Sequence, residues 1–527
     1  MANEPASAPL PPVLRPENPP KRSLSQLAER FGLTVQGAPD GVTVRGITLA
    51  TADLRAGEVF VGIQGARNHG AEFAAAAAEK GAVAVLTDPA GADIARTTGL
   101  PLLVTADPRA VLGGISAWLY STDTDVPVLF ATTGTNGKTS VSHVLEGILG
   151  QLGVVTGLSS TAERHIAGHT IVSRLTTPEA SEMHALLALM RERHVEAVAV
   201  EVSAQALSRH RVDGILFDVA GFTNLTHDHL DDYGDLATYF EAKLALFRPD
   251  RARRGVVSVD TASGWDVVRR SEIPIVTVGA PQLAADPDAA AGADWVVRIE
   301  SEDQQGTAFT VISPDGQKLT TTISVIGAHM AANSALAIAM LVEAGYAFDR
   351  IAAALARDGR VDAVLPGRTE LVSGDRGPAV YVDFSHTPDS FEKTLAAVRK
   401  VTPGRVLMMF GASGNRDTLK RPEMGRIAAA AADIVIVTDH HPRYEEPAPI
   451  RAALLEGARS AGSDAEIHEY PAPEEAIRAA VRMLGDGDAI LWAGPGHQDY
   501  REINGVRTPF SARDLARQAL ADAGWAD

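Results

Sequence analysis

The stretch Thr133-Gly134-Thr135-Asn136-Gly137-Lys138-Thr139-Ser140 (TGTNGKTS) follows the apolar run VPVLFAT and precedes a predicted helix from Ser140 to about Leu152. In a strand, loop and helix arranged in this order, backbone N–H groups at the helix N-terminus can cradle phosphates. Lys138 can neutralise charge on the β- and γ-phosphates, and Thr139 can ligate Mg²⁺. The first glycine of the general P-loop pattern is replaced by Thr132, and the alternative is a glycine-rich turn without a ligand. We predict a loop that binds a nucleoside triphosphate.

Apolar runs that follow this loop predict a parallel sheet. VEAVAVEVS at 195–203 and FDVAGFTNL at 217–225 each end in polar residues. Apolar runs of this kind suit strands that are covered by helices on both faces. Alternating runs between residues 294 and 327 indicate an antiparallel appendage to the same sheet. We therefore predict a central ATPase-like domain over residues 126–365.

Two further α/β units flank this central domain. Residues 24–125 combine short alternating runs with alanine-rich helical stretches, which predicts a small N-terminal domain. Residues 366–527 alternate five strands with helices, which predicts a Rossmann-like domain whose ligands bind beyond the carboxyl ends of the strands. Residues 1–23 are rich in proline and are expected to be a disordered tail. The predicted fold class is thus α/β with three domains.

The composition excludes several classes of protein. A length of 527 residues, with 45% hydrophobic and 22% charged residues, is typical of a folded chain of several domains. The net charge of -18 makes nucleic acid a poor partner. The absence of cysteine excludes disulfides, thiolate nucleophiles and Cys-type zinc sites. Because apolar stretches are interrupted before the ~20 residues that a membrane span needs, and no signal peptide is recognisable, we expect a cytoplasmic protein.

Polar residues at the ends of two predicted strands are candidates for a metal site. A carboxylate at the end of a strand, here Glu201, can supply the acid that a P-loop site needs. The cluster of Asn224, His227, Asp228 and His229 follows the next strand and can be a metal and substrate shell or a solvated helix cap. Lys243 lies on an amphipathic helix, where an isolated lysine is usually a surface residue.

A longer set of motifs, taken in order, resembles the Mur ligase family over roughly residues 40–515. Within that family the resemblance is to the ligases that add the third peptide residue to UDP-N-acetylmuramoyl-L-Ala-D-Glu. Besides TGTNGKTS, the motifs are TTPE at 176–179, EVS at 201–203, RVDG at 211–214, FTNLTHDHLD at 222–231, EAKLALF at 241–247, PGR at 366–368, DFSHTPDS at 383–390, GASGNRDTLKRPEMG at 411–425 and GPGH at 494–497. TGTNGKTS alone would also fit a folylpolyglutamate synthase.

The resemblance implies a three-domain ligase of peptidoglycan precursor synthesis. The N-terminal domain would hold the UDP end, the central domain ATP, and the C-terminal domain the incoming amino acid. ATP would phosphorylate the D-Glu side-chain carboxylate, and the amino acid's amine would attack the resulting acyl phosphate. The implied cofactors are ATP and two Mg²⁺ ions, and the implied partners are UDP-N-acetylmuramoyl-dipeptide and a free amino acid. We expect the enzyme to act as a monomer.

The resemblance also assigns residues to roles. Catalysis would depend on Lys138, Glu201, His227 and Lys243. Magnesium would be held by Thr139, Glu201, His227 and Lys243, the last as a carbamate. ATP would be bound by Gly134, Thr135, Asn136, Gly137, Lys138, Thr139, Ser140, Asn333, Arg368, Asp383 and His386, with Asn136 and His386 flanking the adenine. The UDP-muramoyl peptide would be bound by Thr51, Thr176, Thr177, Ser203 and Arg211. The amino acid would be bound by Arg416, His440, His441, Arg443, Gly494 and Gln498.

The amino-acid pocket departs from the family pattern. Where diaminopimelate ligases have Asp-Asn-Pro-Arg and Gly-Lys-Gly-His-Glu, this chain has His440-His441-Pro442-Arg443 and Gly494-Pro495-Gly496-His497-Gln498. Both carboxylates that would balance a distal ammonium are missing, whereas Arg443 can still hold a carboxylate. Three possibilities remain for the third residue: diaminopimelate with Glu445 or Glu446 compensating, lysine or ornithine, or a neutral or acidic amino acid. The competing functions are a folylpolyglutamate-type ligase and a non-catalytic paralogue that binds the nucleotide sugar.

Overall fold

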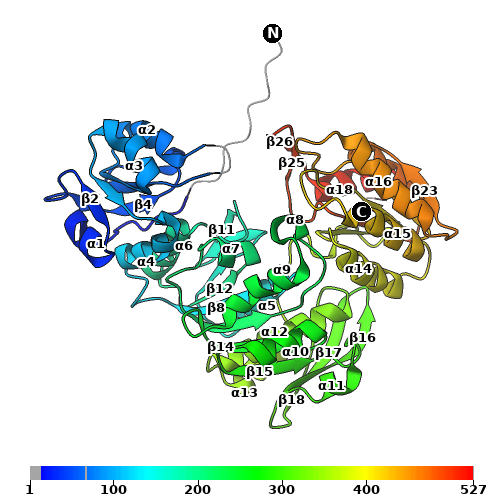
Figure 1. Ribbon diagram of the computed structural model, residues 1–527. Helices are drawn as coiled ribbons and strands as arrows, with labels where there is room; N and C mark the ends of the chain where they lie inside the picture. The colour runs from blue at the N-terminus through cyan, green and yellow to red at the C-terminus, as the bar shows by residue number, and fades with distance from the viewer. Residues whose placement is uncertain (1–12, 66–67, 526–527) are drawn as a thin grey trace.

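The computed structural model describes residues 13–65 and 68–525, which form three α/β units. In Figure 1 the N-terminal unit lies at the upper left, the C-terminal unit at the upper right, and the central unit below and between them. Each unit has its own sheet. The predicted α/β class with three units is confirmed.

The N-terminal unit is built on a five-stranded sheet with the order β2-β7-β6-β5-β4. Its strands are β2 (Thr34–Gln36), β4 (Gly46–Thr48), β5 (Glu58–Gly62), β6 (Ala84–Thr87) and β7 (Leu102–Val104). Strands β4 to β7 pair in parallel, and β2 is antiparallel. The helices are α1 (Leu24–Arg30), α2 (Ala74–Glu79), α3 (Pro89–Ala95) and α4 (Pro108–Tyr120).

Residues 13–23 are ordered, so the prediction of a disordered tail was wrong for them; residues 1–12 lie outside the described residues. The side chain of Arg15 is buried, and its Nε donates to Glu58 Oε1 at 2.9 Å. Strand β1 (Arg22–Ser23) pairs antiparallel with β3 (Thr43–Val44). The buried ion pair and the strand pairing offset the entropic cost of ordering this proline-rich segment.

The central unit has an eleven-stranded sheet with the order β11-β10-β9-β12-β8-β13-β14-β15-β16-β17-β18. Its strands are β8 (Val128–Thr133), β9 (Thr156–Ser159), β10 (Glu163–Ile166), β11 (His169–Val172), β12 (Ala197–Glu201), β13 (Phe217–Phe222), β14 (Ala252–Ser258), β15 (Ile275–Gly279), β16 (Trp295–Asp303), β17 (Gly306–Ile312) and β18 (Lys318–Ile323). The middle of the sheet is parallel, as predicted. Strands β16 to β18 form the predicted antiparallel appendage. The antiparallel β10–β11 hairpin at the other edge was not predicted.

Helices cover both faces of the central sheet. One face carries α5 (Lys138–Gln151), α12 (Ala328–Glu343) and α13 (Phe348–Asp358), and the other carries α6 (Ala180–Glu192), α7 (Ala204–Ser208), α9 (Leu236–Leu244) and α10 (Ala262–Arg270). Side chains of β8 alternate between these faces: Phe130 packs in the first core, and Leu129 and Ala131 pack in the second. This double cover explains why residues 128–131 of β8 are all apolar.

The C-terminal unit has a six-stranded sheet with the order β19-β20-β24-β21-β22-β23. Its strands are β19 (Glu370–Leu371), β20 (Ala379–Asp383), β21 (Val406–Phe410), β22 (Ile434–Val437), β23 (Glu466–Glu469) and β24 (Ala489–Ala493). Only β19 is antiparallel to its neighbour. Its helices are α14 (Pro388–Val401), α15 (Lys420–Ala431), α16 (Pro447–Ser460), α17 (Pro473–Met483) and α18 (Ala512–Asp522), and β25 (Tyr500–Ile503) pairs with β26 (Val506–Pro509) in a hairpin.

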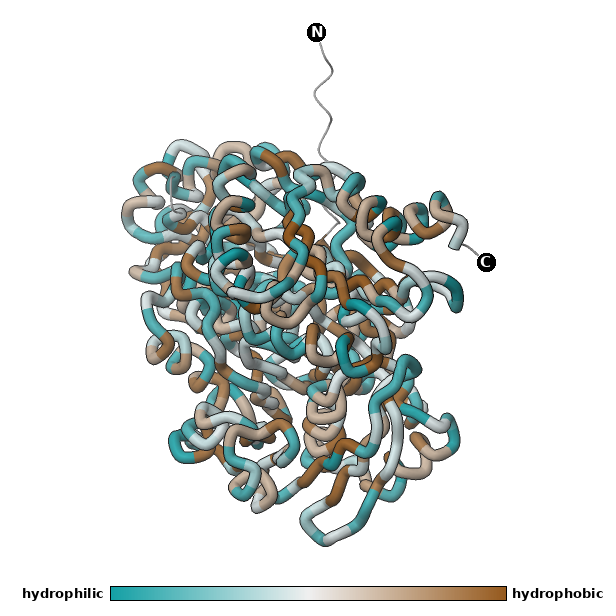
Figure 2. Tube along the Cα trace, turned by 90° about the vertical axis from the view of Figure 1, so that its right-hand side faces the viewer, coloured by the Kyte–Doolittle hydropathy of each residue, from teal (hydrophilic) through white to brown (hydrophobic). Residues whose placement is uncertain are grey.

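Apolar and polar residues alternate along the outer helices, where the tube in Figure 2 changes repeatedly between brown and teal. None of the helices in residues 13–65 and 68–525 has both the length and the apolar character that crossing a lipid bilayer needs. The exact domain boundaries near residues 125 and 365 stay predictions, although each of the three main sheets falls within one predicted domain.

Candidate functional site

A cavity of about 430 Å³ lies between the central and C-terminal units. Its walls are loops that follow β8, β12 and β13 on one side and β20, β21, β22 and β24 on the other, which are the carboxyl ends of parallel strands. Of the residues assigned to the site from the sequence, those lining the cavity are Thr135, Asn136, Gly137, Lys138, Thr139, Ser140, Thr176, Glu201, Ser203, Arg211, Asn333, Arg368, Asp383, His386, Arg416, His440, His441, Arg443, Gly494 and Gln498.

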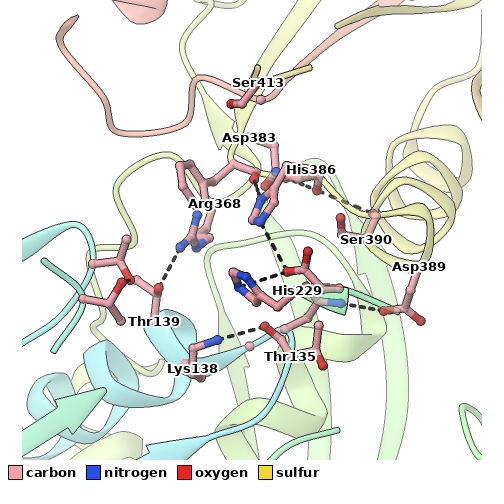
Figure 3. Close-up of a pocket in the computed structure, with 18 of the residues that line it drawn as sticks. Thr135, Lys138, Thr139, His229, Arg368, Asp383, His386, Asp389, Ser390 and Ser413 are labelled. Carbon is pink, nitrogen blue, oxygen red and sulfur yellow. Dashed lines mark hydrogen bonds and ion pairs between the residues drawn. The ribbon is translucent and has the colours of Figure 1, made fainter. Parts of the chain in front are cut away.

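The phosphate-loop candidate has the backbone that its glycines allow. Gly134 and Gly137 have φ values of 148° and 87°, and a Cβ on Gly134 would lie 1.8 Å from Thr223 Oγ1. Helix α5 begins at Lys138, so the loop ends at a helix N-terminus. The Lys138 amine donates to the carbonyl oxygens of Gly134 at 3.0 Å and Thr135 at 2.9 Å. The loop therefore keeps its cation within the cavity (Figure 3).

Glu201 lies at the end of β12, level with Thr132 on the neighbouring β8. Its side chain is fully buried, and its two carboxylate oxygens accept hydrogen bonds from Thr161 N and Thr161 Oγ1, both at 2.8 Å. Burial lowers the pKa of Lys138, and the negative charge of Glu201 opposes that effect. Glu201 is thus a fixed carboxylate close to the phosphate loop, as a metal-binding acid needs to be.

Lys243 is buried, so the general expectation that a lysine on such a helix lies at the surface does not hold for it. The side chain is 1% exposed, and its Nζ donates to Gly134 O at 2.6 Å and lies 4.3 Å from the centre of the Tyr239 ring. Burial, together with the positive charge of Lys138, holds the pKa of Lys243 well below its usual value. Burial behind the phosphate loop therefore favours the neutral form of this amine more than water does.

Residues 227–229 join the central unit to the C-terminal unit. His227 Nε2 lies 3.0 Å from Asp417 Oδ2, and Lys420 Nζ donates to Asp228 Oδ1 at 3.0 Å. Burial would raise the pKa of Asp228, but Lys420 and the nearby histidines outweigh it and hold the pKa well below its usual value. Asp228 is consequently a buried carboxylate that pairs with Lys420 across the interface between the two units.

Further contacts bring the predicted nucleotide residues together (Figure 3). The Arg368 guanidinium donates to Thr139 Oγ1 at 2.6 Å and lies 4.7 Å from the centre of the Phe384 ring. Asn136 Nδ2 donates to Asp389 Oδ2 on α14 at 2.8 Å. These contacts place residues of both units on one cavity that can hold a nucleotide.

The C-terminal loops form one corner of the cavity, which we call the amino-acid corner: Arg416, His440, His441, Arg443 and Gln498. His441 Nδ1 accepts from Glu502 N at 3.0 Å, so His441 Nε2 carries the proton and donates to Gln498 Oε1 at 2.9 Å. Burial lowers the pKa of His441 to about 4 and that of His440 well below its usual value. Both imidazoles are therefore neutral at neutral pH.

Some predicted site residues lie away from the cavity surface: Thr51, Gly134, Thr177, His227 and Lys243. Thr51 lies in the N-terminal unit, where its carbonyl accepts from Lys80 Nζ at 2.8 Å. Thr177 Oγ1 donates to the Glu201 carbonyl at 2.7 Å and so supports the end of β12. Gly134 belongs to the loop backbone, and Lys243, which donates to the Gly134 carbonyl, lies behind the loop.

The sequence reasoning missed Thr161, Asp417 and Lys420, all of which line the cavity. Asp417 and Lys420 stand in the quoted motif GASGNRDTLKRPEMG, which was the available signal. In the part of the chain that the structure describes, no three His, Asp or Glu side chains form a preassembled metal cluster. The hydroxyl of Thr139 and the carboxylate of Glu201 do present the oxygen donors that Mg²⁺ prefers.

Comparison with known proteins gives matches along most of the chain. The families described as "Mur ligase family, catalytic domain", "Mur ligase middle domain" and "Mur ligase, glutamate ligase domain" match residues 43–116, 132–341 and 367–496, respectively. A UDP-N-acetylmuramyl-tripeptide synthetase of Leifsonia xyli subsp. xyli is 57% identical over 519 residues, which cover 98% of this chain and 100% of that protein. A UDP-N-acetylmuramoyl-L-alanyl-D-glutamate--2,6-diaminopimelate ligase of Streptomyces coelicolor is 40% identical, with coverage of 94% and 96%.

Solved structures are similar over comparable lengths. A UDP-N-acetylmuramoyl-L-alanyl-D-glutamate--2,6-diaminopimelate ligase has a TM-score of 0.63 at 25% identity and covers 96% of this chain and 99% of its own. MurF from Acinetobacter baumannii has a TM-score of 0.66 at 17% identity, with coverage of 92% and 96%, which is a likeness of fold alone.

Proposed function

The chain belongs to the Mur ligase family and is an ATP-dependent ligase of peptidoglycan precursor synthesis, and from this premise we propose that it adds the third amino acid to UDP-N-acetylmuramoyl-L-Ala-D-Glu. The family resemblance stated from the motifs is confirmed, and it is favoured over a folylpolyglutamate-type ligase. The observation that carries the proposal is the shared cavity, which joins the phosphate loop to the amino-acid corner. We further propose that the enzyme acts as a monomer.

The chemistry proceeds in two steps. A D-Glu carboxylate oxygen attacks the γ-phosphorus of ATP and ADP leaves, which turns a poor acyl donor into an acyl phosphate. The neutral amine of the amino acid then attacks the acyl carbon, phosphate leaves, and the amine loses its proton. Lys138 and Arg368 stabilise negative charge on the phosphates. Because an acyl phosphate hydrolyses in water, we propose that contact between the central and C-terminal units, which includes the Asp228–Lys420 pair, also shields the intermediate from water.

Magnesium is the cofactor that these residues fit. We assign Thr139 and Glu201 to it, with His227 nearby, because a hydroxyl and a fixed carboxylate flank the loop. Bound Mg²⁺ would neutralise charge on the phosphates. For a second ion, we propose that Lys243 carries a carbamate: its neutral, buried amine attacks CO₂ and releases one proton. The burial and lowered pKa of Lys243 support this assignment, since only a neutral amine adds to CO₂.

The remaining assignments follow from position. We propose that the residues lining the cavity around the phosphate loop contact ATP: Asn136, Asn333, Arg368, Asp383 and His386. We propose that three further residues of the cavity wall contact the muramoyl peptide: Thr176, Ser203 and Arg211. We propose that Thr51 and Thr177 act nearer the UDP end. We propose the N-terminal unit as UDP holder and residues 366–527 as the domain that brings the amino acid.

ATP-dependent phosphate release with UDP-N-acetylmuramoyl-L-Ala-D-Glu and a mixture of amino acids tests this function. We expect release that requires both the dipeptide substrate and an amino acid, with a product one residue heavier by mass spectrometry. Tetrahydrofolate with glutamate serves as the comparison and should give no release. Nucleotide-sugar binding without phosphate release would instead identify a non-catalytic paralogue.

A further inference from the structure

The five residues of the amino-acid corner include two arginines and no carboxylate. Arg416 and Arg443 lie near each other. Burial is the largest cause that lowers the pKa of Arg443, and the positive charge of Arg416 is the second. Arg443 Nε is buried and has no hydrogen-bond partner within the described residues. Glu502 also contributes negative charge near Arg443, but it does not line the cavity. The corner therefore holds two guanidinium groups, one with an unpartnered buried N–H, that can donate to an anion or other acceptor of the ligand.

The neutral side chains of the corner add further donors. Gln498 Oε1 is occupied by the Nε2–H of His441, so the Gln498 amide presents its NH₂ group elsewhere, with only a long contact of 3.4 Å to the Tyr500 hydroxyl. Both ring nitrogens of His441 are engaged in hydrogen bonds, one with Gln498 Oε1 and the other with the backbone N–H of Glu502. His440 is a neutral imidazole that stacks on His441 with ring centres 4.1 Å apart. The corner thus offers N–H groups and no negative charge.

The nearby carboxylates are already engaged. Glu445 pairs with the Arg421 guanidinium at 3.0 Å and accepts from Asn415 N at 2.5 Å. Asp417 is held by His227 at 3.0 Å and by Leu419 N at 2.9 Å. A distal ammonium in this corner would therefore be desolvated beside two arginines, and none of the five residues of the corner offers it a carboxylate, which is unfavourable.

Resting on the proposed function, we propose that the third amino acid has a single amino group and a side chain that ends in an oxygen acceptor, a hydroxyl or a carboxylate, and that diamino acids are rejected. One guanidinium of the corner holds the α-carboxylate. The other guanidinium and the Gln498 NH₂ group donate to the side-chain oxygen. Because the site is built from donors, an analogue that offers only N–H groups leaves them unmatched, which is how polar sites discriminate most strongly.

L-Homoserine and L-2,4-diaminobutyrate form the matched pair for the test, since they differ only by a hydroxyl in place of an ammonium. Phosphate release is measured with the full chain, ATP and UDP-N-acetylmuramoyl-L-Ala-D-Glu, with L-glutamate, L-lysine and meso-diaminopimelate as further substrates. We expect kcat/KM for homoserine or glutamate to exceed that of every diamino acid by at least about tenfold. Faster turnover of a diamino acid, or turnover without such discrimination, overturns the inference and leaves the ligase function standing. No turnover with any amino acid overturns both.

Gln498→Glu supplies the second readout, because a carboxylate at this position still accepts from His441 Nε2 and adds the missing negative charge. The ratio of kcat/KM for homoserine to that for diaminobutyrate should fall by about tenfold. The neutral control Gln498→Asn removes the NH₂ contact without adding charge, so it should lower the ratio less than Gln498→Glu does. His440→Asp, which adds a carboxylate from another loop, should shift the ratio in the same direction as Gln498→Glu. An unchanged ratio in both acidic variants overturns the inference.

Discussion

Replacing Lys243 by alanine should abolish turnover while leaving the fold largely intact. The Gly134 carbonyl, which accepts from Lys243 at 2.6 Å, also accepts from Lys138 Nζ at 3.0 Å, so the substitution orphans no acceptor. The loss is then the packing of a buried lysine stem, about 1–3 kcal/mol of unfolding free energy. Loss of the proposed carbamate, and with it the second magnesium site, should lower kcat by about 10²–10³ or more. Activity should therefore fall far more than stability.

Two assays separate a carbamate from a merely structural lysine. Protein equilibrated with ¹³CO₂ should give a carbamate signal in carbon NMR that disappears in Lys243→Ala and persists in the control Lys400→Ala, whose side chain is exposed. Short-chain carboxylates such as acetate should restore part of the turnover of Lys243→Ala, because they replace the missing carboxylate. Full activity of Lys243→Ala, or a carbamate signal that survives the substitution, would refute the assignment.

Three further perturbations test the rest of the site and the fold. Arg368→Ala should raise KM for ATP at least about tenfold in initial-rate assays, because the donor to Thr139 Oγ1 at 2.6 Å is lost; an unchanged KM counts against its role. Asp228→Asn leaves Lys420 buried without its counter-ion, so it should lower the free energy of unfolding, measured in urea, by about 3–5 kcal/mol. A decrease below about 1 kcal/mol would contradict the importance of the buried pair. Burial lowers the pKa of His165, but hydrogen bonds to two glutamates outweigh it and raise the pKa to about 9. Protonated His165 therefore stabilises the fold. This stabilisation is complete below pH 6.5, the pKa in the unfolded chain, and is lost as the pH rises through 9. His165→Gln should consequently lower the free energy of unfolding by up to about 3 kcal/mol at pH 6 and by much less at pH 10. Equal losses at the two pH values would contradict this account.

The strands that carry the site were predictable because their signal is local. AVYVDF and DAILWA, predicted as strands of the C-terminal unit, contain β20 (Ala379–Asp383) and β24 (Ala489–Ala493). The parallel core around β8 was equally visible in its uninterrupted apolar run. The β10–β11 hairpin was not, because its strands, ERHI and HTIV, are largely polar.

Long-range packing limits what the sequence could reveal about the site. Lys243 lies on a helix whose pattern suits a surface lysine, and only the docking of α9 under the phosphate loop buries it. The pair of Asp228 and Lys420 joins residues 192 positions apart, and no spacing rule relates them. The order of residues 13–23 likewise depends on the partner of Arg15, Glu58, which lies in another element.

The central claim is that a carboxylate of the substrate becomes an acyl phosphate in the shared cavity, and isotope transfer tests it most directly. UDP-N-acetylmuramoyl-L-Ala-D-Glu carrying ¹⁸O in the D-Glu side-chain carboxylate is turned over with ATP and the preferred amino acid, and the released phosphate is analysed by mass spectrometry. The mechanism predicts one ¹⁸O atom in each phosphate released and one amide bond formed per ADP. Phosphate without ¹⁸O, or ADP formation that is not matched by ligated product, would contradict the claim.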